Sequence, residues 1–335
     1  MEVVTAMFIE HIPLRQLPER VSIREVGPRD GLQNEDVILT TDQKVQLINA
    51  LSTTGLEFIE VGAFVRPQNV PQMADTAEVF ARLDRQPGVV YSAIAPNLIG
   101  ARRAVAAGVD SIQVFLSASE SHNQSNVNMS IAQSLAQAAE VATIVNDAGR
   151  LFDAVLSVVF GCPFEGDVPI EQVLDLSGRL LDLGAAQITL GDTTGMAHPR
   201  LVQEVALAFR RRFPRAQLRL HPHSARGAGL ANVLAAMEVG VDRFDASAGG
   251  IGGCPFAPGA PGNICSEDFI HMLHEMGVET GVDLPALLAC ARMLEGLLGH
   301  EVPGQTIKAG ICQHLDADGS PREWRFENQE LRIGA

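Results

Sequence analysis

Short runs of apolar and β-branched residues alternate along this chain with longer stretches of helical periodicity, and this alternation limits the folds that are possible. Strands that alternate with helices form parallel sheets, because each helix returns the chain to the edge where the next strand begins. We predict strands at Val21–Val26, Phe58–Gly62, Val89–Ile94, Ser111–Leu116, Ala154–Phe160, Gln187–Leu190, Gln217–His221 and Arg243–Ala246.

The segments between these runs have helical periodicity, for example 41–55, 130–149, 169–184 and 229–240. Each of these four ends in glycine, the residue that favours a helix C-terminus. Strand–helix units in this number predict a closed (β/α)₈ barrel in the α/β class. An open doubly wound sheet is the alternative, but no GxGxxG motif follows the first strand. We expect an N-terminal extension over 1–20, a catalytic barrel domain over 21–300 and a C-terminal tail over 301–335.

Composition excludes several classes of partner and location. The net charge of −15 disfavours nucleic acid and anionic membranes, because both attract clustered lysine and arginine. No apolar run reaches the roughly 18 residues of a transmembrane helix. The N-terminus has early acidic residues in place of the basic and apolar regions of a secretory signal. The cysteines are few, odd in number and lack zinc-finger spacing, so we expect a reduced, cytoplasmic protein.

Polar residues collect where the predicted strands end, which is the face of a (β/α)₈ barrel that carries active sites. The residues concerned are Arg29, Asp30, Gln33 and Asn34 after the first strand, Glu60 in the second, Asp192 and Thr193 after the sixth, and His221 and His223 at the seventh. The eighth strand leads into a loop rich in glycine and proline, which can hinge over such a site.

The pair His221 and His223 is the strongest local signal. Residues two apart in a strand point to the same side, so both imidazoles can reach one metal ion. Asp30 can add a carboxylate oxygen and Asn263 an amide oxygen, and this donor set favours Mg²⁺ or Mn²⁺, with Zn²⁺ or Co²⁺ as competitors. The alternatives are a hydrogen-bonded histidine pair without a metal, and an Asp30 that caps the following helix.

Further residues have both a chemical and a structural interpretation. A thiol at Cys254, in the loop after the eighth strand, can act as an acid or base, or can pack as a small apolar group beneath the loop. Cys162 has the same two interpretations. Arg29 can stabilise the oxygen of an enolate or simply pair with Asp30, and Glu60 can orient Arg29 or satisfy a buried neighbour. The remaining cysteines, Cys265, Cys290 and Cys312, are interpreted as structural.

Seven motifs, in order along 21–300, resemble the 3-hydroxy-3-methylglutaryl-CoA lyase family, within the group of metal-dependent barrel lyases and Claisen-type synthases. They are EVGPRDGLQNE (25–35), IEVGAFV with VPQMAD (59–75), APNLIGARRAVAAG (95–108), FGCPFEG (160–166), LGDTTG (190–195), HPH (221–223) and GGIGGCPFAPGAPGN (249–263). The last motif is the most specific, because the synthases generally lack its cysteine.

The resemblance implies a divalent-metal-dependent lyase that cleaves 3-hydroxy-3-methylglutaryl-CoA to acetyl-CoA and acetoacetate by retro-Claisen chemistry, and a place in leucine degradation. It implies metal ligands at Asp30, His221, His223 and Asn263. It implies catalytic roles for Arg29, Cys254, Glu60 and Asp192. We expect Gln33, Thr193 and Arg226 to contact the substrate, an acyl-CoA as the small-molecule partner, and a homo-oligomer.

The sequence departs from the family pattern at two places. After the histidines the family usually has Asp, Thr, an aromatic residue and Gly, where this chain has Ser224, Ala225, Arg226 and Gly227. Asp36 stands where the family commonly has a lysine that helps to bind CoA phosphates. These changes favour, as alternatives, a lyase for another 3-hydroxy-acyl-CoA such as a citramalyl-type thioester, or a non-catalytic acyl-CoA-binding barrel. A synthase running the reverse reaction is a third possibility, which Cys254 disfavours.

Overall fold

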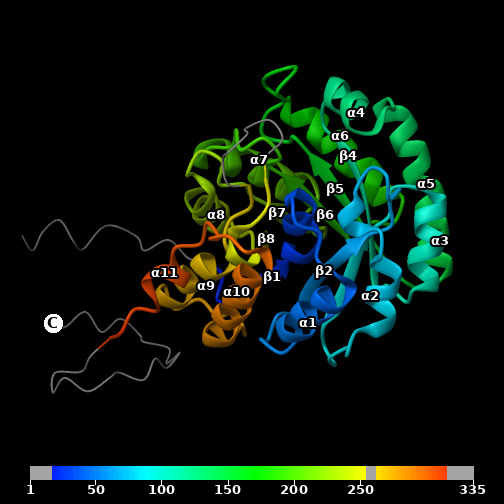
Figure 1. Cartoon of the computed structure of the whole chain (residues 1–335). Helices are drawn as coiled ribbons and strands as arrows, with labels where there is room; N and C mark the ends of the chain where they lie inside the picture. Colours follow the sequence, from blue (N-terminus) through cyan, green and yellow to red (C-terminus); the bar gives the residue numbers. More distant parts are fainter. Residues whose placement is uncertain (1–16, 254–261, 315–335) are drawn as a thin grey trace, which may run out of the picture.

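Parallel strands form a closed barrel in this computed structural model, which describes residues 17–253 and 262–314 (Figure 1). The barrel follows chain order from β1 to β8, and β8 closes it by pairing with β1. The strands are β1 (Ser22–Glu25), β2 (Phe58–Ala63), β3 (Val90–Ile94), β4 (Ser111–Ser117), β5 (Leu151–Ser157), β6 (Gln187–Gly191), β7 (Gln217–His221) and β8 (Arg243–Ala246). The predicted (β/α)₈ barrel is confirmed.

The prediction was wrong for the bounds of β5, which begins and ends three residues earlier than Ala154–Phe160. The chain leaves the extended conformation at Val158, whose φ is 54°. Val158 and Phe160 are nevertheless buried, and the N–H of Val159 between them donates to the carbonyl of Gly191 at the end of β6 at 3.1 Å. A buried apolar loop has the same sequence pattern as a buried strand, so the pattern could not separate the two.

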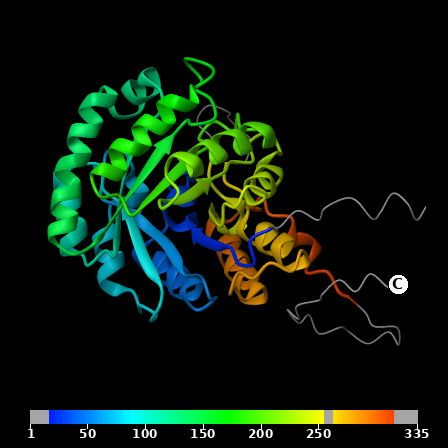
Figure 2. The same cartoon turned by 180° about the vertical axis from the view of Figure 1, so that it is seen from behind.

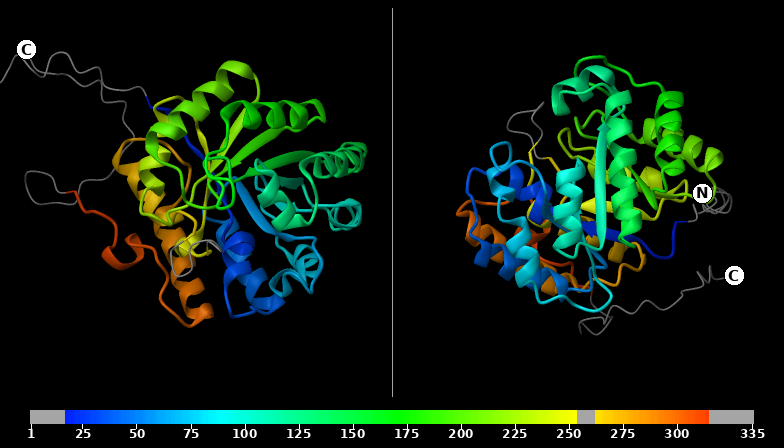
Figure 3. Two further views of the ribbon diagram at one scale, coloured as in Figure 1. Left: turned by 90° about the horizontal axis from the view of Figure 1, so that it is seen from above. Right: turned by 90° about the vertical axis from the view of Figure 1, so that its right-hand side faces the viewer.

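Helices surround the strands, as Figure 3 shows from above. They are α1 (Thr41–Ser52), α2 (Thr76–Arg82), α3 (Leu98–Ala106), α4 (Glu120–Val127), α5 (Ile131–Asp147), α6 (Ile170–Asp182), α7 (Pro199–Arg212), α8 (Gly229–Met237), α9 (Ser266–Glu275), α10 (Leu284–Leu298) and α11 (Thr306–Ala309). Two of the longest begin with reciprocal capping boxes, Thr40 with Gln43 before α1 and Ser130 with Gln133 before α5. Each box satisfies backbone N–H groups that the first helical turn leaves without a partner.

The two faces of the strands differ in polarity. Ile59, Ile112 and Phe244 are fully buried apolar residues of the core. Polar residues beside them in the same strands, such as Gln113 and Asp245, are also buried and lie in a hydrogen-bonded network inside the barrel. The apolar core therefore lies between strands and helices, and the barrel interior is a polar network that must be satisfied internally.

The end of the described chain packs against α9 and α10 on the outside of the barrel (Figure 2). Val302 is buried, and the backbone N–H of Gly304 donates to the carbonyl of Gly249 at 2.9 Å. The Asp268 carboxylate accepts from the N–H groups of Gln305 and Thr306 at the start of α11. The division of the chain at residues 20 and 300 stays a prediction. Within the described ranges, no helix has the length and apolar character needed to cross a membrane.

Candidate active site

A tight turn after β1 brings two of the predicted site residues to the mouth of the barrel. The carbonyl of Val26 accepts from the N–H of Asp30 at 2.7 Å and from that of Gly31 at 3.3 Å, in a π-helical turn over Gly27–Gly31. The turn is stabilised through its backbone, and its side chains are free for other contacts. Asp30 does not cap a helix, because no side-chain cap bond occurs at either short helix here.

Three of the four predicted metal ligands lie together. One ligand atom from each of Asp30, His221 and His223 lies within 4.8 Å of the other two. The two Nε2 atoms of the histidines are 3.1 Å apart, and His221 Nε2 is 3.7 Å from Oδ2 of Asp30. The barrel order explains this convergence, since Asp30 follows β1 and β1 lies two strands from β7 across β8.

The charges and lone pairs of this cluster fit a divalent cation. Burial disfavours a charged Asp30, but Arg29 and the two histidines outweigh it and hold its pKa at about 2. Burial and the neighbouring His221 lower the pKa of His223 to about 3, so this imidazole is neutral and has a lone pair to offer. Nδ1 of His223 is buried with no hydrogen-bond partner of good geometry among the described residues. A proton or a metal ion must separate the two facing Nε2 atoms.

His221 is oriented by a carboxylate from the neighbouring strand. Its Nδ1 lies 3.1 Å from Oδ2 of Asp245 in β8. Burial lowers the pKa of His221, but the hydrogen bond to Asp245 and the charge of Asp30 outweigh burial and raise it. Asp245 therefore stabilises the proton on Nδ1 and leaves Nε2 directed at Asp30 and His223, the arrangement that metal-binding histidines usually have. Although this chain has Ser224 where the family has an acid, His221 still has a carboxylate partner, which is Asp245.

Asn263 lies beside the cluster through short backbone bridges. It pairs with His223, and two residues later Cys265 pairs with Ser247. Nδ2 of Asn263 donates to Oδ2 of Asp30 at 2.9 Å and to the carbonyl of Ile251 at 3.1 Å. Coordination through Oδ1 of Asn263 stays a prediction.

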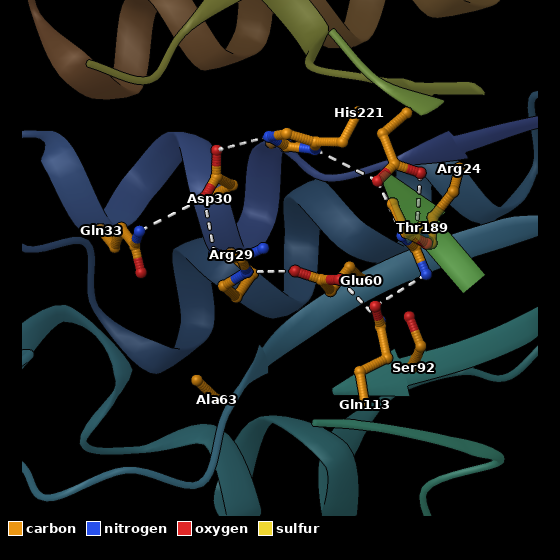
Figure 4. A network of polar contacts seen from close by, with 12 residues as sticks. Arg24, Arg29, Asp30, Gln33, Glu60, Ala63, Ser92, Gln113, Thr189 and His221 are labelled. Atoms are coloured by element: carbon orange, nitrogen blue, oxygen red, sulfur yellow. Dashed lines mark hydrogen bonds and ion pairs between the residues drawn. The ribbon is translucent and has the colours of Figure 1, made fainter. Parts of the chain in front are cut away.

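Arg29 is held between two carboxylates at the edge of the cluster (Figure 4). Its Nε donates to Glu60 in β2, and its Nη1 donates to Oδ1 of Asp30 at 2.5 Å. Gln33 also donates to Oδ1 of Asp30, at 3.3 Å. Burial opposes the guanidinium charge, but Glu60 and Asp30 outweigh it and raise the pKa of Arg29. A fixed positive charge thus borders the predicted metal ligands.

Sequence reasoning missed a chain of buried polar contacts that connects Glu60 to His221. Gln113 in β4 donates to Oε2 of Glu60 at 2.6 Å and accepts from Nη1 of Arg24 at 2.8 Å. Arg24 in β1 donates to both oxygens of Asp245, at 2.9 and 2.7 Å. The available signal was a polar residue in the middle of an apolar strand run, at Arg24, Gln113 and Asp245.

Asp192 and Thr193 lie in the loop after β6, and each side chain accepts a hydrogen bond from a backbone N–H group. Oδ1 of Asp192 accepts from the N–H of Ala197 at 3.0 Å, while Oδ2 is buried with no partner among the described residues. Burial raises the pKa of Asp192 to about 7. Oγ1 of Thr193 accepts from the N–H of Val158 at 3.1 Å. Arg226 reaches the same loop, where its Nη1 donates to the carbonyls of Thr194 and Gly195.

The cysteines differ in exposure. Cys254 lies outside the described residues, so its catalytic role stays a prediction. Cys162 is buried, with its sulfur 2.9 Å from Oγ of Ser119, which favours the structural interpretation. Cys265 and Cys290 are buried as expected for structural residues. Cys312 is exposed, and its interpretation as a structural residue stays a prediction.

Comparisons with known proteins find similar sequences and structures over most of this chain. The HMGL-like family model matches residues 20–294. The hydroxymethylglutaryl-CoA lyase of Bacillus subtilis is 45% identical over 87% of this chain and 97% of its own. The 3-hydroxy-3-isohexenylglutaryl-CoA/hydroxy-methylglutaryl-CoA lyase of Pseudomonas aeruginosa is 41% identical over 89% of this chain and 99% of its own. An HMG-CoA lyase structure from A. baumannii, with coenzyme A and 3-methylmalate, is 46% identical, covers 89% of this chain and 97% of that chain, and superposes with a TM-score of 0.85.

Proposed function

This chain belongs to the HMGL-like family, and on that basis we propose that it is a carbon–carbon lyase that cleaves 3-hydroxy-3-methylglutaryl-CoA to acetyl-CoA and acetoacetate. The observation that carries the proposal is the convergence of Asp30, His221 and His223 within 4.8 Å, with the Arg29 guanidinium bonded to Asp30. An acid–imidazole cluster beside a fixed cation suits a reaction that develops negative charge on oxygen.

The cleavage is a retro-Claisen reaction. The tertiary hydroxyl on C3 of the substrate loses its proton, C3 becomes the ketone carbon of acetoacetate, and the C2–C3 bond breaks. Its electron pair forms the enolate of acetyl-CoA, which then takes one proton at carbon. A divalent cation held by Asp30, His221 and His223, with Asn263 as the fourth residue, would supply Lewis acidity to the hydroxyl and carbonyl oxygens. Arg29 stabilises the negative charge on oxygen, and Glu60 holds Arg29 in position.

Two residues are proposed for the proton transfers. Asp192 has a pKa of about 7, which suits a group that must both accept and donate a proton near neutral pH. Its backbone N–H donates to the carbonyl of His221 at 2.9 Å, which ties its loop to the metal cluster. Cys254 is proposed as the acid that protonates the enolate carbon. Gln33, Thr193 and Arg226 are proposed to line the acyl-CoA site, Arg226 by fixing the loop after β6.

The proposal extends to the ion, the partners and the location. Carboxylate, amide and imidazole donors favour Mg²⁺ or Mn²⁺ over thiol-seeking metals. The coenzyme A bound to the A. baumannii relative supports an acyl-CoA substrate. The words "cytoplasmic" in the names of the rat and mouse relatives support a cytoplasmic location. A homo-oligomer and a place in leucine degradation complete the proposal.

Product analysis tests the reaction. Purified protein loaded with Mg²⁺ or Mn²⁺ is mixed with 3-hydroxy-3-methylglutaryl-CoA, and the products are identified by mass spectrometry. We expect acetyl-CoA and acetoacetate in equal amounts, no product after chelation, and no product from a folded His223→Ala variant. Unchanged cleavage after complete metal removal would show that the mechanism is wrong.

The Pseudomonas aeruginosa relative motivates a second substrate in the same assay, because its name includes a longer 3-isohexenyl chain. A citramalyl-type thioester is the third substrate, since Ser224, Arg226 and Asp36 depart from the family pattern. The ratio of kcat/KM values among the three thioesters identifies the acyl group. Cleavage of none of them by a folded, metal-bound protein would favour the non-catalytic acyl-CoA-binding barrel.

A further inference from the structure

A second cluster of metal-binding side chains lies on the outside of the barrel, at the C-terminal end of α9. His271 and Glu275 are one helical turn apart on this helix, so their side chains lie on one face. The chain returns to this face after α11, where it carries Cys312 and His314. The residues thus come from two segments about 40 positions apart in the sequence, and only the fold brings them together.

The ligand atoms of this cluster are already close. One atom from each of His271, Glu275 and Cys312 lies within 4.8 Å of the other two. The N–H of Cys312 donates to Nε2 of His271 at 3.3 Å, so the lone pair of this imidazole points toward the segment that carries the thiol. Nε2 of His314 is 2.8 Å from Oε2 of Glu275, which places a fourth donor beside one member of the cluster.

We propose that His271, Glu275, Cys312 and His314 bind a zinc-type divalent cation that fastens residues 311–314 to α9. Two imidazoles, a carboxylate and a thiolate form a borderline-soft donor set, which suits Zn²⁺ better than the oxygen-seeking Mg²⁺. Zinc bonds of about 2.0–2.3 Å place tetrahedral ligands roughly 3.3–3.8 Å apart, so the side chains need to contract by about 1 Å. The partly exposed side chains of His271 and Glu275 and the exposed Cys312 can do so by rotating.

Binding changes protonation only. The Cys312 thiol and any protonated imidazole release their protons to solvent, the cation accepts the four lone pairs, and no electron transfer occurs. The N–H of Cys312 loses its bond to His271 and becomes free for water. Because the cation would join residues 311–314 to α9, it is expected to hold this segment on the helix. This proposed site shares no residue with the barrel cluster of Asp30, His221 and His223.

Metal stoichiometry tests the proposal. Tag-free, reduced full-length protein is titrated with Zn²⁺ by calorimetry and the bound metal is counted by mass spectrometry. We expect two equivalents per chain for the wild type and one for His271→Ala or Cys312→Ser, with affinity for the second equivalent lowered at least about a hundredfold, beyond the effect of losing an outer partner. The Co²⁺-loaded wild type is expected to show thiolate-to-metal absorption in the near ultraviolet that Cys312→Ser weakens.

Two controls separate the sites. His223→Ala, in the barrel cluster, is expected to lose the other equivalent and to keep the one at α9. His198→Asn removes an imidazole but retains a capping side chain at the start of α7, and should still bind two equivalents. A His271→Ala variant that binds as many equivalents as the wild type, or a Cys312→Ser variant that does so with unchanged affinity, would overturn the proposal. Neither result depends on whether the lyase reaction occurs.

Discussion

Asp245 connects the structural interior of the barrel to the metal cluster through a single carboxylate. It accepts two hydrogen bonds from Arg24 and lies 3.1 Å from Nδ1 of His221. Burial disfavours its charge, but Arg24 and His221 outweigh burial and hold its pKa well below the ordinary range. A residue that is not itself a predicted metal ligand thus decides which nitrogen of His221 carries the proton.

Asp245→Asn is expected to weaken metal binding with little change in fold. The amide has the same shape, but its N–H₂ group can donate to Nδ1 of His221 and move the ring proton to Nε2, where the metal should bind. The expected loss in Mn²⁺ affinity is roughly 10–100-fold. Calorimetry measures the affinity, and nitrogen chemical shifts of the His221 ring report the tautomer. An unchanged affinity with an unchanged tautomer would contradict this role.

Gln113 is predicted to position Arg29 through Glu60. Gln113→Leu has a similar volume but leaves Glu60 and Arg24 each without one buried partner, at about 1–3 kcal/mol per group in the free energy of unfolding. Displacement of Arg29 is expected to lower kcat roughly 10–100-fold while KM changes little.

Ser92→Ala is the matched control for Gln113→Leu, since Ser92 lies in the same region (Figure 4) and makes only a long bond of 3.4 Å to the carbonyl of Ile59. It should retain near wild-type kcat and stability. If Gln113→Leu lowered stability and left kcat at the wild-type value, Gln113 would be a structural residue only.

At the scale of elements, the segment that follows β8 carries a backbone constraint next to the site. Gly252 has φ of 116°, and a Cβ atom there would lie 2.5 Å from Nδ2 of Asn263. Gly252→Ala is therefore expected to displace Asn263 and to weaken Mn²⁺ binding, besides about 1–3 kcal/mol of backbone strain. Gly88→Ala is the control, because Gly88 has φ of 86° and open space around it. Equal metal affinity in both variants would mean that Asn263 does not contribute to the site.

Most elements could be predicted from the sequence because hydrophobic periodicity is a local signal, and the alternation of strands and helices is enough to indicate the barrel. The strands at β7 and β8 have the predicted bounds, and the order of strands alone brings Asp30 to His221 and His223. The error at β5 arose because burial of a loop depends on what covers it, which no local pattern records.

The inner network could not be predicted for a related reason. A polar residue within an apolar run signals a buried polar contact, but its partner depends on strand register around the closed barrel. Gln113 meets Glu60 across two strand boundaries, and Arg24 meets Asp245 through the β1–β8 pairing that closes the barrel. The cluster at Cys312 depends likewise on the return of the chain after α11.

At the scale of the whole molecule, two buried glutamates connect the ends of β1 and β8 to α9. Glu25 accepts from the N–H of Gly27 at 2.7 Å, from that of Ala248 at 2.8 Å and from Oγ of Ser266 at 2.6 Å. Glu267 accepts from the N–H of Gly249 at 2.9 Å. These contacts join the first strand of the barrel to α9 and to the segment that follows the last strand, so the charge state of both groups affects the stability of this junction.

Burial raises the pKa of Glu25 and of Glu267 to about 7, above an unfolded value near 4.5. Between these two pH values the folded protein retains protons that the unfolded chain releases, so the free energy of unfolding falls as the pH rises from about 4.5 to 7. The loss per group is roughly 3 kcal/mol at 1.36 kcal/mol per pKa unit, an upper value because the two groups interact. Above pH 7 this contribution no longer changes.

Glu267→Gln is expected to remove its share of this pH dependence, because the amide accepts the N–H of Gly249 without a charge. The free energy of unfolding is measured in urea at pH 5 and at pH 8 for the variant and the wild type. The value for the variant minus that for the wild type should be about 2–3 kcal/mol larger at pH 8 than at pH 5. Subtracting the wild-type free energy from that of the variant at each pH cancels the contributions of other titrating groups, such as His223. Glu204→Gln, an exposed carboxylate on α7, should show no such difference. Parallel stability curves for Glu267→Gln and the wild type would mean that Glu267 is ionised in the folded protein at both pH values, and that the closure of the barrel tolerates its charge.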